Sequence, residues 1–398
     1  MNLNQTPRGM RLHIGIFGKR NSGKSSLMNA LTNQKAAIVS EIAGTTADPV
    51  YKSMEIHGIG PVVFIDTAGF DDEGYLGEKR VDMTEKAFRK TDVAIIVFSS
   101  MPGAEEDEWT KKLKKAGIPI IPVVNKADIL ENAKEIAAEA EKMTGIPALT
   151  ASALEKTGID GIRKALIKSV PEDYDSLTLT GGLASDGDSV LLVMPQDIQA
   201  PKNRLILPQV QTIRELLDRK CITVCCTADR MDQALASMKN PPNLIITDSQ
   251  AFPTVWEKKP EKSLLTSFSI LMAGLKGDIG EFAKGAEAIS RLGPSSHVLI
   301  AEACTHAPLP EDIGREKIPA MLRKRAGESL QVTISAGADF PKDLSKYDLI
   351  IHCGACMFNR RYVLSRIEQA KEAGIPITNY GIAIAYMSGI LDKISIGG

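Results

Sequence analysis

Cysteine and histidine side chains follow two apolar runs in the last third of the chain. Cys304-Thr305-His306 comes after the run 298–301, and His352-Cys353-Gly354-Ala355-Cys356 comes after the run 347–351. Both runs are typical of short buried strands of a parallel sheet. Because ligands collect at the carboxyl ends of parallel strands, we expect these soft ligands to share one crevice. The pattern predicts a metal centre whose candidate ligands are Cys304, His306, His352, Cys353 and Cys356.

The spacing of these residues leaves the kind of metal centre open. Three cysteines and one histidine would complete a tetrahedral zinc site. Three cysteines would also hold a 4Fe–4S cluster, with one iron left for a weaker or exchangeable ligand. The remaining cysteines, Cys221, Cys225 and Cys226, lie in one strand-like run, where neighbouring side chains point to opposite faces. We expect them to pack in the core as small hydrophobic residues.

A phosphate-binding pattern stands near the N-terminus. The strand-like run 11–17 leads into Gly18-Lys-Arg-Asn-Ser-Gly-Lys24-Ser25, the complete G-x-x-x-x-G-K-[ST] pattern, and a helical segment follows. The glycines let backbone N–H groups turn toward phosphates, and the helix N-terminus adds partial positive charge. Lys24 is expected to reach the β- and γ-phosphates, and the Ser25 hydroxyl is expected to bind Mg²⁺.

Three further segments follow in the order that a guanine-nucleotide site requires. Asp66-Thr-Ala-Gly69 comes after the apolar run 61–65 and suits the Mg²⁺ side and the γ-phosphate. Asn125-Lys126-Ala-Asp128 comes after the run 119–124, and the Asp128 carboxylate can accept hydrogen bonds that guanine offers and adenine lacks. Ser152-Ala153-Leu154 supplies a backbone contact to the guanine oxygen. Together these segments predict a GTP-binding domain.

This domain resembles the TrmE and Era-like GTPases, and the segment 36–46 is similar to their switch. The resemblance implies a K⁺ ion held by Asn21, the Ser40 and Ile42 carbonyls and Thr45, with Thr46 joining Mg²⁺. The ion would place positive charge where the transition state accumulates negative charge. Phe70 replaces a water-orienting Gln, so we expect slow, K⁺-dependent hydrolysis; Ala47 replaces the family's usual Arg. The expected nucleotide contacts are Asn21, Ser22, Gly23, Lys24, Ser25, Ser26, Thr45, Thr46, Asp66, Gly69, Asn125, Lys126, Asp128, Ser152, Ala153 and Leu154, with Asn21, Lys24, Thr46 and Asp66 as catalytic candidates.

Composition bounds the class of protein. The chain has 398 residues, a formal charge of −1 and 43% hydrophobic residues, which are ordinary values for a soluble multidomain protein. The near-neutral charge argues against nucleic acid as the main partner. Neither a signal-peptide-like segment nor a membrane-spanning apolar run is evident, so we expect a cytoplasmic protein without membrane attachment. In a cytoplasmic protein we do not expect these six cysteines to form a disulfide framework.

Alternating strand-like and helical runs predict an α/β architecture with mainly parallel sheets. We expect a P-loop GTPase domain over 1–172, a small α/β dimerisation domain over 173–268 and a cluster-binding α/β domain over 269–398. The run 264–270 is expected to be the last strand of the middle domain. The segment 359–373 is expected to form a helix with a basic face.

The whole chain resembles the HydF family of FeFe-hydrogenase maturation GTPases, because a GTPase domain precedes C-x-H and then H-C-x-x-C. The resemblance implies that Cys304, Cys353 and Cys356 hold a 4Fe–4S cluster, with His306 or His352 near its fourth iron. It further implies a homodimer formed through the middle domain. Such a protein would receive a transient diiron subcluster precursor from two radical-SAM maturases and deliver it to apo FeFe-hydrogenase. The alternatives are an RNA- or ribosome-associated GTPase with a structural zinc site, and a GTP-regulated redox sensor.

Overall fold

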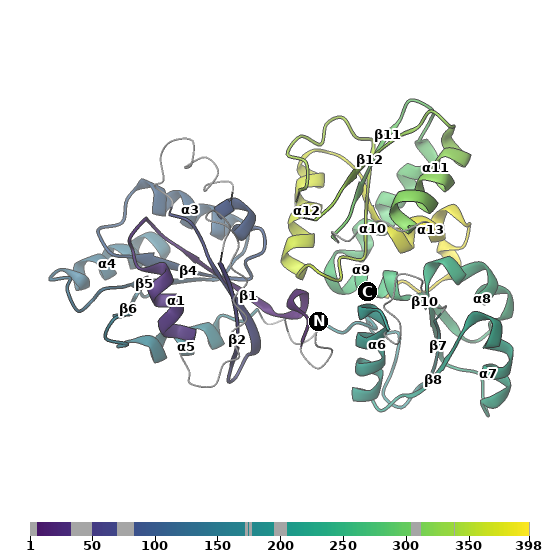
Figure 1. The fold of residues 1–398 in the computed structure, drawn as a ribbon, viewed down its shortest axis with the longest axis horizontal. Coiled ribbons are helices and arrows are strands. Elements are labelled where there is room, and N and C mark those ends of the chain that lie inside the picture. The colour runs from purple at the N-terminus through teal and green to yellow at the C-terminus, as the bar shows by residue number, and fades with distance from the viewer. Residues whose placement is uncertain are drawn as a thin grey trace. The chain divides into compact units, whose positions relative to one another are not determined.

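The chain forms two compact units, 1–176 and 177–398, each of which is described by itself. Figure 1 shows their helices and strands in a computed structural model. The residues that the structure describes are 6–32, 50–69, 83–171, 174, 177–194, 205–303, 312–337 and 339–397.

The first unit is built on a sheet in which the described strands lie in the order β2-β3-β1-β4-β5-β6. Its strands are β1 (Leu12–Phe17), β2 (Val50–Ile56), β3 (Gly60–Asp66), β4 (Val93–Phe98), β5 (Ile120–Val124) and β6 (Leu149–Thr150). All neighbours are parallel except β2 and β3, which are antiparallel. Every residue of β1 and β4 is buried, as a central parallel strand covered on both faces requires.

Helices cover both faces of this sheet (Figure 1). They are α1 (Lys24–Thr32), α3 (Ala104–Lys115), α4 (Ala133–Thr144) and α5 (Ile159–Lys168), with a 3₁₀ turn, η1 (Arg8–Met10), before β1. Residues of α1 and α5 pack with Ile95 and Val97 of β4, whereas α3 and α4 pack with Ile96 and Phe98. The alternation of side chains along β4 therefore supplies both core layers. Because β1, β3, β4 and β5 run parallel, the carboxyl ends of β1, β3 and β5 lie at the same end of the sheet.

The second unit contains two four-stranded parallel sheets, ordered β10-β9-β7-β8 and β12-β11-β13-β14. Their strands are β7 (Ser189–Val193), β8 (Ile222–Cys226), β9 (Leu244–Thr247), β10 (Leu264–Ser267), β11 (His297–Ala301), β12 (Gln331–Ser335), β13 (Leu349–His352) and β14 (Ile377–Asn379). The register pairs Ala301 of β11 with His352 of β13, so these two strands end side by side.

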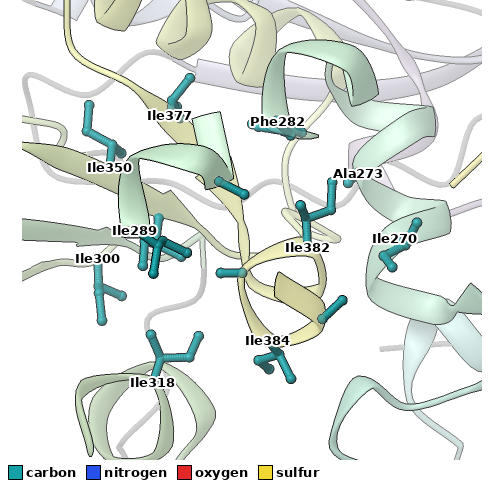
Figure 2. Packing of buried hydrophobic residues seen from close by; sticks show 14 of the residues in the cluster. Ile270, Ala273, Phe282, Ile289, Ile300, Ile318, Ile350, Ile377, Ile382 and Ile384 are labelled. Atoms are coloured by element: carbon teal, nitrogen blue, oxygen red, sulfur yellow. The ribbon is translucent and has the colours of Figure 1, made fainter. Parts of the chain in front are cut away.

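The helices of the second unit join both sheets to one hydrophobic core. They are α6 (Leu207–Asp218), α7 (Met231–Ser237), α8 (Phe252–Lys258), α9 (Phe268–Lys276), α10 (Ile279–Ala286), α11 (Ile318–Ala326), α12 (Arg360–Glu372) and α13 (Tyr380–Met387), with 3₁₀ turns η2 (Ala228–Arg230), η3 (Ser249–Ala251), η4 (Glu287–Arg291) and η6 (Leu391–Lys393) and a π-helical turn, η5 (Ile313–Lys317). Leu191 of β7 and Ile300 of β11 belong to the same buried cluster. Figure 2 shows α13 inside this core, where its Ile382 lies toward Ala273 of α9.

The predicted fold class is confirmed: the structure is a mixed α/β protein with an N-terminal P-loop domain and mainly parallel sheets after it. The predicted domain limits at 172 and 268 stay a prediction. No helix among the described residues has the length and apolar character needed to cross a bilayer.

Two expectations about single segments were correct only in part, since the run 264–270 begins as the strand β10 and the segment 359–373 contains the helix α12. The run 264–270 changes from strand to helix at Ser267, because the Ser267 hydroxyl accepts a hydrogen bond from the Ile270 N–H at 3.3 Å and caps α9. The helix α12 does not carry all its basic residues on an exposed face, since Arg366 is only 1% exposed.

The prediction that Cys221, Cys225 and Cys226 all pack in the core was also wrong. Cys221 is buried, Cys226 is half-buried against the core and Cys225 is exposed. The physical reason is that β8 is an edge strand among the described residues, with a neighbouring strand on one side only, and none of its residues is fully buried.

Candidate functional site

The phosphate-binding loop connects β1 to α1 and turns through left-handed backbone conformations. Asn21 has φ of 58° and Gly23 has φ of 88°. A side chain at position 23 would also collide with the Asn125 amide, because an added Cβ would lie 2.3 Å from its Nδ2 atom. Glycine is therefore required here for both backbone conformation and space. The Lys24 ammonium lies over the loop and donates to the Gly18 and Lys19 carbonyls at 2.9 and 2.8 Å.

The two residues predicted to bind Mg²⁺ lie in contact. The Ser25 hydroxyl, at the start of α1, donates to Oδ2 of Asp66, at the end of β3, at 2.5 Å. The other carboxylate oxygen, Oδ1, is buried without a hydrogen-bond partner among the described residues. Burial raises the pKa of the Asp66 carboxyl, while the Ser25 hydrogen bond and the Lys24 charge oppose this effect. A hydroxyl and a carboxylate with an unused oxygen form a donor set that fits Mg²⁺, a hard cation that prefers oxygen ligands.

Asn125 joins the phosphate-binding loop to the predicted base-recognition segments. Its Nδ2 atom donates to the carbonyls of Ser22 and Gly23 at 3.2 and 3.4 Å, and its Oδ1 atom accepts from the Ala153 N–H at 3.1 Å. Lys126 has a left-handed φ of 62°. These contacts bring the segments at 18–25, 125–128 and 152–154 together at the carboxyl ends of the strands.

The remaining predicted nucleotide contacts have the following places. Gly69 is buried after β3, Ser26 is exposed on α1, and Asp128 lies on an exposed turn. The Ser152 hydroxyl accepts from the Glu155 N–H at 3.0 Å, while the Leu154 side chain is 78% exposed. Other predictions lie outside the described residues: Ser40, Ile42, Thr45, Thr46, Ala47, Phe70, Cys304 and His306.

The second predicted site begins where β13 ends. The Cys353 N–H donates to the Ala301 carbonyl at 2.9 Å and continues the pairing of β13 with β11. The Cys353 Sγ atom accepts from the backbone N–H groups of Ala303 at 3.0 Å and Ala355 at 3.4 Å. Ala355 has a left-handed φ of 50°, which turns the chain sharply between Cys353 and Cys356. Two predicted cysteine ligands thus share a tight turn, and the residue before Cys304 contacts one of them.

The donor set of this second site is compatible with a metal but is incomplete within the described residues. No three His, Cys, Asp or Glu side chains gather there as a metal site in the part of the chain that the structure describes. Burial raises the pKa of the Cys353 thiol to about 11, and its two N–H contacts act in the opposite direction. A thiolate that accepts N–H hydrogen bonds is a usual feature of iron–sulfur ligation.

His352 is placed differently from the sequence prediction. The ring is fully buried; its Nε2 atom lies 2.9 Å from Nη1 of Arg366, and its Nδ1 atom lies 2.8 Å from the Cys353 carbonyl oxygen. Burial, and then the Arg366 charge, lower its pKa to about 3. Both ring nitrogens are engaged in hydrogen bonds, so the arrangement disfavours His352 as a metal ligand.

Three family models match parts of the chain. Residues 179–277 match the hydrogen maturase F dimerization domain, and residues 280–395 match the hydrogen maturase F tetramerization domain. The two matches together cover more than half of the chain. The chain belongs to the hydrogen maturase F family. Residues 13–126 match the family described as 50S ribosome-binding GTPase. The prediction of a P-loop GTPase domain is thereby confirmed for this hydrogen maturase F chain.

Curated relatives are similar to the GTPase domain. GTPase Der of Wolinella succinogenes is 40% identical over 167 residues, which are 39% of this chain and 35% of that protein. The tRNA modification GTPase MnmE of Chromobacterium violaceum is 36% identical over 162 residues, 40% of this chain and 35% of that protein. The chain thus spans about a third of the length of these relatives. Among solved structures, Aquifex aeolicus Era bound to GDP and AlF₄⁻ is 20% identical, with a TM-score of 0.35 and coverage of 56% of this chain and 97% of that chain.

Sequence reasoning missed two polar groups beside the cysteines of this hydrogen maturase F chain. One is Arg366, which the sequence suggested only as part of a basic surface. The other lies at the end of β11, where Arg315 donates to the Glu302 carboxylate at 2.9 and 3.2 Å and the Tyr380 hydroxyl lies 3.5 Å from it. Neither group follows from local spacing, because each joins segments that are far apart in the sequence.

Proposed function

We propose that this chain is a GTP-hydrolysing maturation factor for FeFe-hydrogenase. It would bind a 4Fe–4S cluster through Cys304, Cys353 and Cys356 and act as scaffold and carrier for the diiron subcluster precursor. Two radical-SAM maturases would supply the precursor, and apo FeFe-hydrogenase would accept it. The observation that carries the proposal is the contact from Ala303 to the Cys353 sulfur, in a chain of the hydrogen maturase F family.

The residues of the first site have distinct roles in this proposal. The Lys24 ammonium would exchange its contacts with loop carbonyls for contacts with the β- and γ-phosphates of GTP. Ser25, Asp66 and Thr46 would hold Mg²⁺, which supplies positive charge against the phosphates. Asn21 and Thr45 would contribute to a K⁺ site. Asp128 would select guanine, and the Asn125 hydrogen bonds would keep its loop in register with the phosphate-binding loop.

The residues of the second site would act by positioning. The backbone N–H groups of Ala303 and Ala355 would stabilise negative charge on the Cys353 sulfur. The left-handed turn at Ala355 brings Cys356 back toward Cys353 without requiring a glycine at that position. The bound cluster would present an iron with an exchangeable ligand for the cargo. His306 remains a candidate near that iron.

We further propose that the chain self-associates as a homodimer through its middle region. The match of 179–277 to a family dimerization domain supports this proposal. The strand β8 supports it independently, since it is an edge strand of its sheet among the described residues and carries Ile222, which is 64% exposed.

The first test is anaerobic reconstitution of the whole chain with iron and sulfide, followed by visible absorption and by EPR after reduction. We expect a brown protein whose reduced-cluster signal is lost in the Cys353→Ser, Cys356→Ser double variant. A Cys225→Ser, Cys226→Ser double variant is the matched control and should keep the signal. A colourless protein with one tightly bound zinc would contradict the proposal and favour a structural metal site.

The second test concerns hydrolysis. Phosphate release from GTP should require Mg²⁺ and should be several-fold faster in potassium than in sodium buffer. Replacing Lys24 by Met should abolish this activity while leaving cluster reconstitution unchanged. Equal rates in the two buffers would contradict the proposed K⁺ site.

A further inference from the structure

A guanidinium group is buried beneath the cysteine turn. Arg366 lies on α12, is 1% exposed and is the largest of the fully buried side chains among the described residues. A buried charge is costly unless hydrogen bonds and favourable electrostatics replace the lost water. Its retention in a core otherwise rich in Ile, Leu and Val therefore calls for a role that an apolar side chain could not serve.

Aromatic faces surround the Arg366 guanidinium. Its central carbon lies 4.8 Å from the ring centroid of Phe340, 5.1 Å from that of Phe358 and 4.8 Å from that of Tyr362. The electron-rich faces of these rings attract the cation. Its Nη2 atom donates to the Gly337 carbonyl at 2.6 Å and lies 3.4 Å from the Tyr362 hydroxyl. These contacts fix the plane of the group and aim its other amino group, Nη1, at His352.

The chemistry of arginine then fixes the proton of His352. Guanidinium N–H groups donate and cannot accept, so the 2.9 Å contact to Nε2 requires an unprotonated Nε2 atom. The neutral ring must carry its proton on Nδ1, which can donate to the Cys353 carbonyl 2.8 Å away. A chain of hydrogen bonds thus runs from Arg366 through His352 to the backbone of Cys353.

These hydrogen bonds add to other contacts that hold the cysteine turn in place. The Cys353 N–H is held by Ala301, its sulfur by two N–H groups, and its carbonyl by His352. The Asn379 side chain also donates to the His352 carbonyl at 3.3 Å. The orientation of the Cys353 peptide is therefore set from α12 and from the neighbouring strands β11 and β14.

We propose that Arg366 is a positioning residue of the cysteine site, holding His352 as a non-ligating support of Cys353 and placing a permanent positive charge beneath the cysteine pair. The part that concerns the charge rests on the proposed function, because it acts on a bound cluster. A nearby positive charge stabilises the more negative, reduced cluster, so Arg366 raises the reduction potential.

The first experiment is independent of any metal. Long-range ¹H–¹⁵N NMR on the metal-free chain, labelled at histidine, should show His352 as the neutral Nδ1–H tautomer. His13, whose Nδ1 atom lies 2.9 Å from the Arg11 carbonyl oxygen, can give a second signal with a protonated Nδ1 atom. A His352→Gln variant assigns the signal. The Nδ1–H tautomer should be lost or mixed in Arg366→Met, partly kept in Arg366→Lys, and unchanged in Arg325→Met, which removes an exposed guanidinium on α11. A wild-type His352 in the Nε2–H form would overturn the proposal, even if Arg366→Met proves too unstable to study.

The second experiment measures the reconstituted cluster by redox titration followed with EPR. We expect a lower potential and an altered reduced-cluster signal in Arg366→Met, a smaller change in Arg366→Lys, which keeps the charge, and none in Arg325→Met. Equal potentials in wild type and both Arg366 variants would overturn the role of the charge while leaving the scaffold function intact. A wild-type chain that binds no iron–sulfur cluster would instead overturn the proposed function, and the NMR result would then stand alone.

Discussion

Asp128 is the residue predicted to select guanine, and it lies exposed on a turn that follows the left-handed Lys126. Asp128→Asn should weaken GTP binding by ~3 kcal/mol, on the order of a hundredfold, because an amide cannot accept two hydrogen bonds from guanine as a carboxylate does. The same variant should gain affinity for xanthosine triphosphate, which offers an acceptor instead of the exocyclic amine. Calorimetric titration with both nucleotides measures the loss of affinity for GTP and the gain of affinity for xanthosine triphosphate.

The control for this prediction is Asp160→Asn, which changes an exposed carboxylate paired with Arg163 on α5. It should leave both affinities unchanged. Unaltered GTP affinity in Asp128→Asn would show that the segment 125–128 does not read the base.

Cys225 offers a test of local electrostatics at the edge of β8. Although Cys225 is exposed, protein atoms around its thiol displace part of the surrounding water, and this desolvation raises the pKa of the thiol above the ordinary value of 9.0. Because the thiolate is the nucleophile and a raised pKa favours the neutral thiol, alkylation should still be accelerating as pH passes through 9. Site-resolved mass spectrometry after timed iodoacetamide exposure gives the rate, with Cys225→Ser identifying the peptide. A rate that levels off below pH 9 would contradict the predicted direction.

At the scale of elements, the start of α9 depends on one hydroxyl group. Ser267 caps the helix and also lies 2.9 Å from the Ser249 hydroxyl in the core. Ser267→Ala should therefore lower the free energy of unfolding of the second unit by ~2 kcal/mol, since it removes a cap and leaves a buried partner with fewer hydrogen bonds. Each unit holds one of the two tryptophans. Denaturant unfolding followed by Trp256 fluorescence, in a Trp109→Phe background, isolates the second unit.

Ser237→Ala is the matched control for this measurement, because the Ser237 hydroxyl is exposed and donates to the Ala234 carbonyl within its own helical turn. It should change stability by less than about 0.5 kcal/mol. A similar loss in both variants would mean that the cap does not determine where α9 begins.

The elements also show which structural features the sequence could predict. The GTPase strands were predictable because apolar runs end at motifs whose chemistry requires a turn there, as at Asp66 and Asn125. The cysteine turn was predictable for the same reason. In contrast, α13 is apolar on every side and lacks helical periodicity; its clearest local signal is Asn379, whose side chain accepts from the Gly381 N–H. The contact of Arg366 with His352 was not predictable, since a buried cation contradicts the usual preference of arginine for the surface.

At the scale of the whole molecule, the proposed self-association is expected to use a sheet edge that has no neighbouring strand among the described residues. The edge strand β8 carries Ile222, which is 64% exposed, and Leu217 on the adjacent helix α6 is 59% exposed. The opposite edge strand, β10, presents Leu264, which is 43% exposed. An open strand edge flanked by apolar side chains is a favourable surface for pairing with a second copy. The β8 edge is therefore the stronger candidate for the proposed dimer interface.

Ile222→Lys tests this assignment, because a dimer formed through β8 would have to bury the new ammonium. Association should weaken by at least ~3 kcal/mol, about a hundredfold in the dissociation constant. Size-exclusion chromatography with light scattering, over a range of concentrations, should show a shift to smaller species in Ile222→Lys. Leu264→Lys introduces the same charge at the other edge and should leave the mass unchanged. Loss of association in both variants, or in neither, would contradict a dimer built on β8. Dissociation in Ile222→Lys alone would support it. If that variant also keeps GTP hydrolysis, self-association is independent of the GTPase site.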